Sequence, residues 1–201
     1  MRKASIERET RETSIQLELV LEGSGKTEIC TGVGFFDHML DAMSRFALLD
    51  LKVRCEGDLQ VDSHHTVEDV GICLGRALAQ ALGDRKGIRR AGSAMLPMDD
   101  ALACVALDIS GRPYLAFSAA FGSPMLGTMD TQLAEEFFRA VAVQAGLTLH
   151  VRLLDGRNDH HKMEAIFKAF GLALRDACAI DPRIEGVLST KGSLDRGGVS
   201  E

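Results

Sequence analysis

Two copies of one short motif carry the residues of this chain that are best suited to binding metal ions. Each copy reads His-His-x-x-Glu, at residues 64–68 and 160–164, and leads into apolar residues of helical period. Together they hold four of the six histidines, and Gly75 and Gly171 extend the match at the same offset of 96 residues. Because chance would have to supply the repeat as well as the ligands, we interpret the pattern as two metal sites rather than two solvated helix starts.

The period of a helix determines which motif residues can bind the same ion. Positions i and i+4 lie nearly above one another, whereas position i+1 is turned away by about 100°. The first histidine and the glutamate of each copy can therefore hold one ion, giving the pairs His64 with Glu68 and His160 with Glu164. The second histidine, His65 or His161, can reach the ion of the other copy if the two helices face each other. The spacing thus predicts two similar metal sites with crossed ligands.

Alignment of the two halves suggests a further ligand for each ion. Residues 49–53 align with residues 147–151, and the residues eleven positions before these segments are His38 and Glu136. His38 is then a natural ligand for one ion, with Glu136 as its counterpart for the other. His150, on the strand face opposite the apolar residues, competes with Glu136 for this role. Both alternatives stay open at this point.

The types of ligand restrict the metal and indicate its use. Imidazole and carboxylate without thiolate suit manganese, iron, zinc or nickel, and argue against calcium or copper(I). Three or four protein ligands per ion leave coordination positions open, as a catalytic site requires. We therefore expect a substrate to bind directly at the metals.

Several cations are suited to holding an anionic group of that substrate. Segments 89–92, 110–113 and 189–192 each place a cation beside small or turn residues, where an anion can approach backbone N–H groups. Singly each segment is more typical of a solvated surface charge, but beside open metal sites in an acidic chain they suggest a phosphate clamp. Lys168, one helical turn after Glu164, either contributes to the clamp or forms an ion pair within its helix.

The elements that position these residues form a repeated unit. The period of the apolar residues predicts strands within 4–33, including a hairpin of 14–21 with 27–33, and then a helix capped by Asp37. A strand and the first motif helix follow, and the second half repeats the order. The predicted elements of the second half are strands 101–109, 114–121 and 147–151 and helices 132–145 and 160–177.

This arrangement predicts an α/β (α+β) fold of two layers. It is a tandem duplication of a strand-strand-helix-strand-helix unit, in which each half is a small sheet with helices on one face. We place the first half at residues 1–90 and the second at 91–201, with a mobile tail from about residue 186.

Composition excludes several classes of function. The formal charge of −6 argues against general nucleic-acid binding, and no apolar run is long enough to cross a membrane. No signal peptide is evident after Met1, and the five cysteines are scattered without CxxC spacing. These features predict a cytoplasmic protein with reduced thiols.

Five ordered motifs also give the chain a family resemblance. They are TGVGFFDHML (31–40), DSHHTVEDVG (62–71), DISGRPYL (108–115), GRNDHHKMEAIFKAF (156–170) and STKG (189–192). From about Arg8 to Gly192 the sequence resembles imidazoleglycerol-phosphate dehydratase of histidine biosynthesis. The resemblance implies removal of water from a small phosphorylated imidazole, D-erythro-imidazole-glycerol phosphate, through a metal-bound imidazolate. It also implies two manganese ions (Mn2+) per active site, and a homo-oligomer that is a 24-mer of trimers with sites at subunit contacts.

The resemblance further assigns roles by position. One manganese would be held by His38, His65, His160 and Glu164, and the other by His64, Glu68, His161 and the residue at position 136. Many members have histidine there, so Glu136 is a departure, and we expect a retained site of altered affinity. The positions that match the phosphate site are Arg90, Arg112, Ser189 and Lys191. Glu12 matches an acidic position at the substrate, and the candidate catalytic carboxylates are Glu12, Glu164 and Glu68.

Two other functions are compatible with the ligand pattern. A two-metal phosphoesterase requires ions about 3.5–4 Å apart with a shared ligand, whereas crossed ligands predict separate ions. A metal-scaffolded, non-enzymatic assembly protein would have coordination saturated by protein and no open position for an imidazole.

Overall fold

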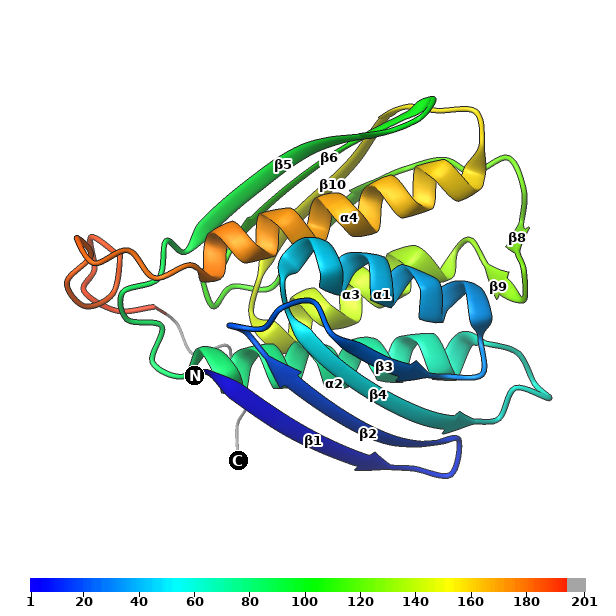
Figure 1. Ribbon diagram of the computed structural model, residues 1–201, viewed down its shortest axis with the longest axis horizontal. Helices are drawn as coiled ribbons and strands as arrows, with labels where there is room; N and C mark the ends of the chain where they lie inside the picture. Colours follow the sequence, from blue (N-terminus) through cyan, green and yellow to red (C-terminus); the bar gives the residue numbers. More distant parts are fainter. Residues whose placement is uncertain (195–201) are drawn as a thin grey trace.

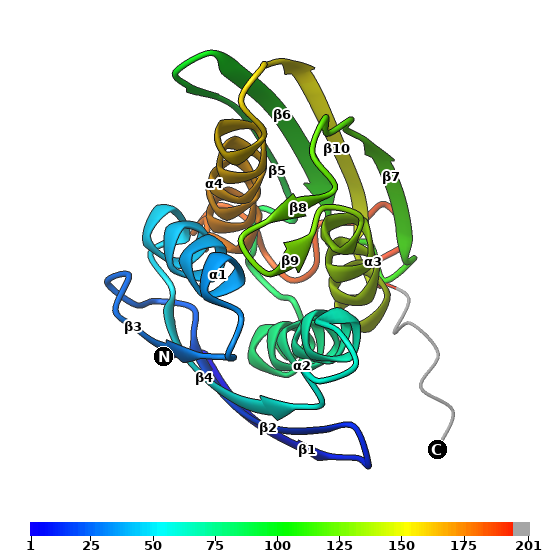
Figure 2. The ribbon, with the colours of Figure 1, turned by 90° about the vertical axis from the view of Figure 1, so that its right-hand side faces the viewer.

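Two four-stranded sheets enclose a layer of helices in the computed structural model, which describes residues 1–194 (Figure 1). Seen from the end, one sheet lies below the helices and the other above them (Figure 2). The elements of the first half are β1 (Lys3–Glu9), β2 (Thr13–Val20), β3 (Thr27–Cys30), α1 (Gly34–Ala47), β4 (Asp50–Gly57) and α2 (His64–Leu82). This is the two-layer, duplicated α/β architecture that the sequence predicts.

The second half repeats the first with one addition. Its elements are β5 (Ala91–Met98), β6 (Ala101–Asp108), β7 (Tyr114–Ser118), β8 (Met125–Leu126), β9 (Met129–Asp130), α3 (Leu133–Ala145), β10 (Thr148–Asp155) and α4 (Asp159–Cys178). The short pair β8–β9 has no counterpart in the first half. Each half begins with three strands where the predicted unit has two, and β5 was not predicted at all.

The strand order corrects the predicted hairpin of 14–21 with 27–33. The sheets have the orders β1-β2-β4-β3 and β5-β6-β10-β7, so β4 lies between β2 and β3 and pairs with β3 in parallel. β10 separates β6 from β7 in the same way. β4 and β10 each follow a helix in the chain, because a strand that pairs in parallel with an earlier one needs a crossover connection.

Glycine allows the helices to approach closely across the layer. α2 packs on α3, and α4 packs on α1. A Cβ atom at Gly75 would lie 2.9 Å from the Val141 carbonyl oxygen of α3, and one at Gly171 would clash with the Met43 carbonyl oxygen of α1. The repeated glycines therefore lie where the helices of each pair approach closely. Buried aromatic side chains fill the layer around them, among them Phe36, Phe137, Phe138, Phe167 and Phe170.

All four helices begin at one end of the molecule and finish at the other (Figure 1). α2 ends before Gly83, whose φ of 54° suits glycine. Asn158 caps the start of α4, because its side chain accepts from the backbone N–H of His160. Asp37 does not cap α1 as predicted, because the helix already begins at Gly34. Its carboxylate instead accepts from the Thr31 backbone N–H at 3.0 Å.

None of the helices within residues 1–194 has both the length and the apolar character needed to cross a membrane. Part of the predicted tail is tied to the body, because Gly87 N donates to Gly186 O and Arg90 donates to Leu188 O. The rest of that tail, residues 195–201, lies outside the described residues.

Candidate active site

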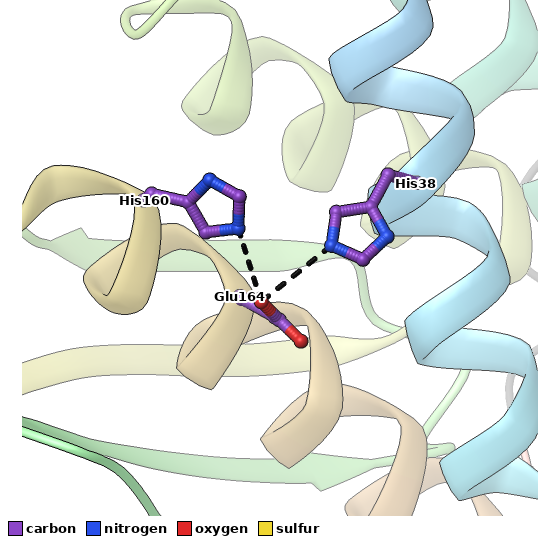
Figure 3. Close-up of side chains that lie close together, drawn as sticks. All are labelled: His38, His160 and Glu164. Atoms are coloured by element: carbon purple, nitrogen blue, oxygen red, sulfur yellow. Dashed lines mark hydrogen bonds and ion pairs between the residues drawn. The ribbon is translucent and has the colours of Figure 1, made fainter.

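Three metal-ligating side chains meet between the first turns of α1 and α4. The ligand atoms of His38, His160 and Glu164 all lie within 4.8 Å of one another (Figure 3). Oε2 of Glu164 is 3.2 Å from Nε2 of His160 and 3.6 Å from Nε2 of His38. Phe35 packs edge-on against the His160 ring, at 5.1 Å between centroids.

This geometry suits a single ion. Ligand atoms about 2.1 Å from a common ion lie roughly 3–4 Å from one another, which is the range of the two distances to Glu164. Two imidazole nitrogens and a carboxylate oxygen are also the donor set expected for manganese, iron or zinc. The three residues therefore fit a metal ion, and they leave coordination positions for other ligands.

The surroundings of Glu164 favour its ionised form, which is the form that binds metal. Its side chain is buried, and Lys168 Nζ lies 2.6 Å from the second oxygen, Oε1. Burial, the largest single effect, opposes ionisation of Glu164, but the hydrogen bond and charge of Lys168, together with His38 and His160, outweigh it, so the pKa of the carboxyl lies below its ordinary value. Lys168 lies over the Phe46 ring, so the structure places it at Glu164 and not among the other predicted clamp residues.

The second predicted ligand set begins on α2. His64 Nε2 lies 3.8 Å from Glu68 Oε2, one helical turn further on. His64 and Glu136 line the same pocket, of about 470 Å³. Glu136 also accepts from Arg139 at 3.3 Å. Within residues 1–194, however, His64, Glu68 and Glu136 do not come as close together as His38, His160 and Glu164, whose cluster is the one group of this kind.

The adjacent histidines of each motif diverge as helix geometry predicts. The rings of His64 and His65 are 6.1 Å apart at an interplanar angle of 77°, and those of His160 and His161 are 6.2 Å apart at 80°. Neither His65 nor His161 belongs to the three-residue cluster.

Each second histidine is held by carboxylates instead. His65 Nδ1 lies 3.0 Å from Asp58, and its Nε2 lies 3.8 Å from Glu12 in the turn between β1 and β2. The hydrogen bond to Asp58 raises the pKa of His65. This role of Asp58 was missed from the sequence, where its only signal is a carboxylate between a strand and the motif helix.

His161 has a similar environment built from other residues. Its Nδ1 lies 2.6 Å from Asp100 Oδ1, and its Nε2 lies 3.5 Å from Asp99. The hydrogen bond from His161, and then the amides of Asn158 and Arg157, hold the pKa of Asp100 well below its ordinary value. Asp99 and Asp100 form the turn between β5 and β6.

His150 lies apart from these groups. It is exposed on β10, between the buried Leu149 and Val151, so it faces away from the helix layer. Its ring is 6.0 Å from that of Tyr114. The structure therefore brings Glu136, and not His150, to the pocket that His64 lines.

The predicted anion-binding residues gather at the opposite end of the helices. Arg90, Arg112, Ser189 and Lys191 line one open pocket of about 750 Å³. Arg90 is already paired with Asp108, at 2.7 and 2.9 Å, and Arg183 adds a further positive charge to the pocket. Arg90 N donates to Ala177 O near the end of α4, whereas His160 lies near its beginning.

Comparison with known proteins identifies the family. Residues 31–174 match the family model for imidazoleglycerol-phosphate dehydratase. The chain belongs to the imidazoleglycerol-phosphate dehydratase family. A curated relative of that name from Acetivibrio thermocellus is 60% identical over 193 residues, covering 96% of this chain and 99% of the relative. Another from Desulfitobacterium hafniense is 57% identical, with 96% and 99% covered.

Solved imidazoleglycerol-phosphate dehydratases share the fold. The Staphylococcus aureus structure has a TM-score of 0.81 and 41% identity, covering 89% of this chain and 99% of that one. The Pyrococcus furiosus structure, in complex with (S)-C348, has a TM-score of 0.81 and 38% identity, with 94% and 100% covered. The protein is thus a dehydratase, a hydro-lyase of histidine biosynthesis. The two alternatives, a phosphoesterase and a non-catalytic assembly protein, are therefore set aside.

Proposed function

We propose that the protein converts D-erythro-imidazole-glycerol phosphate to imidazole-acetol phosphate at a site that holds two manganese ions. One ion would be bound by His38, His160 and Glu164, completed by His65, and the other by His64, Glu68 and Glu136, completed by His161. The observation that carries the proposal is the cluster of His38, His160 and Glu164, whose ligand atoms already have the spacing that one ion requires. Bound ions would act as Lewis acids toward the imidazole ring of the substrate.

Glu12 is the carboxylate best placed to move a proton. The reaction removes a hydroxyl group from the carbon attached to imidazole and hydrogen from the neighbouring carbon, which gives an enol that becomes the ketone of the product. Both oxygens of Glu164 already have partners, Lys168 on one side and the histidines on the other. Glu12 is exposed in its turn, with its carboxylate 3.8 Å from His65 Nε2. We therefore assign removal of hydrogen from the neighbouring carbon to Glu12, and ligand roles to Glu164 and Glu68.

The separation of the two candidate sites supports a shared active site. His160 and Glu164 lie near the start of α4, whereas Arg90 of the cationic pocket donates its backbone N–H to Ala177 O near the end of that helix. The two ends of α4 point to opposite ends of the molecule (Figure 1). With a rise of about 1.5 Å per residue, a helix of this length separates its ends by roughly 30 Å. One small substrate cannot touch both ends of the same chain. A second copy would have to supply the phosphate clamp of Arg90, Arg112, Ser189 and Lys191.

The second histidines support the same conclusion. His65 and His161 stand outside the cluster of their own chain, and each has an Nε2 directed to exposed carboxylates. A neighbouring copy could take up both as ligands. The family resemblance gives the size of the assembly that we expect, a 24-mer built from trimers.

Five free cysteines agree with a cytoplasmic location.

Metal removal and return test the proposed site. Protein stripped with a chelator should lose dehydratase activity and recover it with Mn2+, and elemental analysis should find two ions per chain. His160→Gln should lower the metal content below two ions per chain and reduce kcat by at least about a hundredfold. His150→Gln should change neither quantity. Two ions bound with full turnover by His160→Gln would refute the ligand assignment.

A further inference from the structure

The second histidine of each motif has its Nδ1 bound by a carboxylate from a neighbouring loop. Both oxygens of Asp58 face Nδ1 of His65, at 3.1 and 3.0 Å, and Asp100 Oδ1 lies 2.6 Å from Nδ1 of His161. We propose that Asp58 and Asp100 are positioning residues that fix the ring orientation and the Nδ1–H tautomer of these two histidines. The inference rests on the proposed function, in which His65 and His161 bind metal through Nε2.

The hydrogen-bonding chemistry determines the tautomer. An ionised carboxylate can only accept, so the nitrogen that faces it must carry hydrogen. In a neutral imidazole the other nitrogen, Nε2, then has a free lone pair. That lone pair is the form a metal ion binds, and a carboxylate on the far nitrogen also makes the ring a stronger ligand.

The two carboxylates are themselves held in place. Asp100 Oδ2 accepts from the backbone N–H groups of Arg157 and Asn158, at 2.5 and 2.9 Å, just before α4 begins. Asp58 donates its own backbone N–H to the Glu12 carbonyl oxygen at 3.0 Å. Each histidine is therefore oriented by a loop whose backbone is already fixed, so the ring loses little freedom when it binds an ion.

The duplication does not explain this contact, because the two carboxylates occupy non-equivalent positions. Asp58 follows β4, so its counterpart in the second half would follow β10. Asp100 lies between β5 and β6, so its counterpart in the first half would lie in the turn between β1 and β2. The same contact to Nδ1 is thus made by two different loops. Inheritance from one ancestral half would have placed both carboxylates at the same position of the repeat.

The first histidines differ in this respect. His64 and His160 direct Nε2 to the glutamate one turn further along their own helix, at 3.8 and 3.2 Å. Their orientation comes from the helix that also carries the partner ligand. The second histidines have no such partner within their motif, so a loop carboxylate takes over the orienting role.

Nitrogen NMR of the metal-free protein tests the tautomer directly. The protein would be labelled with 15N-histidine, sedimented, and measured by magic-angle spinning at about pH 8.5, where imidazole is neutral. Difference spectra with His65→Gln and His161→Gln would assign the two rings. Both should carry hydrogen on Nδ1, and an Nε2–H ring at either position in the wild-type protein would overturn the proposal.

Variants extend the test to metal binding. Asp58→Asn offers an amide donor to Nδ1, so His65 alone should shift toward Nε2–H, and Mn2+ affinity should fall about 10–100-fold. Asp58→Ala, which removes the acceptor, should allow both tautomers. Asp84 is an exposed carboxylate paired with Lys86, so Asp84→Asn is the matched control. It should change neither the tautomer of His65 nor the Mn2+ affinity.

Two outcomes separate this proposal from the proposed function. Unchanged tautomer and unchanged Mn2+ affinity in Asp58→Asn would overturn the positioning role of Asp58. A His65→Gln protein that binds two ions as tightly as the wild type would instead refute the ligand role of His65, whichever tautomer the ring adopts.

Discussion

Lys168 Nζ binds one oxygen of the Glu164 carboxylate, Oε1, at 2.6 Å. The other oxygen, Oε2, is left to face His38 and His160. Lys168 is itself largely buried and lies 5.1 Å from the centre of the Phe46 ring. An ammonium group in this position keeps Glu164 ionised although its side chain is buried. The ion pair that the i, i+4 spacing offers is therefore part of the candidate metal centre.

Replacement of Lys168 should make metal binding more sensitive to acid. Burial alone would raise the pKa of Glu164, and in the wild-type protein Lys168, together with His38 and His160, overcomes that effect and lowers it. The metal-binding carboxylate is thus present above its lowered pKa and is lost as the pH falls through that value. In Lys168→Met only His38 and His160 still oppose the effect of burial, so the pKa of Glu164 should rise and loss of Mn2+ on acidification should begin at a higher pH than in the wild type.

Metal titrations across the acid range measure this effect. Arg175→Met, on the same helix but bonded to the Phe46 carbonyl oxygen, is the matched control and should keep the wild-type profile. Lys168→Arg should restore most of it. Identical acid profiles for Lys168→Met and the wild type would show that Lys168 does not control the charge of Glu164.

Glu136 and His150 can be distinguished by metal stoichiometry. Glu136 lines the pocket that includes His64, whereas His150 is exposed on the other side of β10. Glu136→Ala should therefore lower the affinity for one of the two ions by at least about tenfold while the other ion stays bound. His150→Ala should leave both ions in place. The opposite result would return His150 to the ligand set.

Close packing of the helices gives a prediction for stability. Gly171→Ala would force α4 away from the Met43 carbonyl oxygen of α1, so it should destabilise the protein by about 1–3 kcal/mol. Gly34→Ala is the control, because a Cβ there has no neighbour within 4 Å. Thermal unfolding should show a lower Tm for the first variant and little change for the second. Equal Tm values would mean that α1 and α4 tolerate a side chain at position 171.

The sequence predicts the parts of this molecule that depend on local spacing. The period of the motif helices places His64 and His160 near the starts of their helices, and the alignment of the halves does the same for His38 and Glu136. The four helix starts lie at one end of the helix layer (Figure 1). Strand order was not predictable in the same way, because β4 enters between β2 and β3 from a distant part of the chain. β5 was missed since Pro97 interrupts its pattern, although proline is tolerated in an edge strand.

Contacts between distant loops also escaped prediction from the sequence. Asp58 precedes His65 by seven residues, and no helical or strand period relates the two positions. The contact of Asp100 with His161 also depends on the approach of the β5–β6 turn to α4. The separation of the cationic pocket from the metal ligands likewise becomes visible only when the helices are placed in space.

Subunit complementation tests the shared active site most directly. His160→Gln damages the metal end of one chain and Lys191→Ala damages the cationic pocket of another, and each variant alone should be nearly inactive. If the two ends of a site come from different copies, mixed and reassembled oligomers should regain up to about one quarter of wild-type activity. Mixed oligomers that remain as inactive as the separate variants would contradict a site built from two chains.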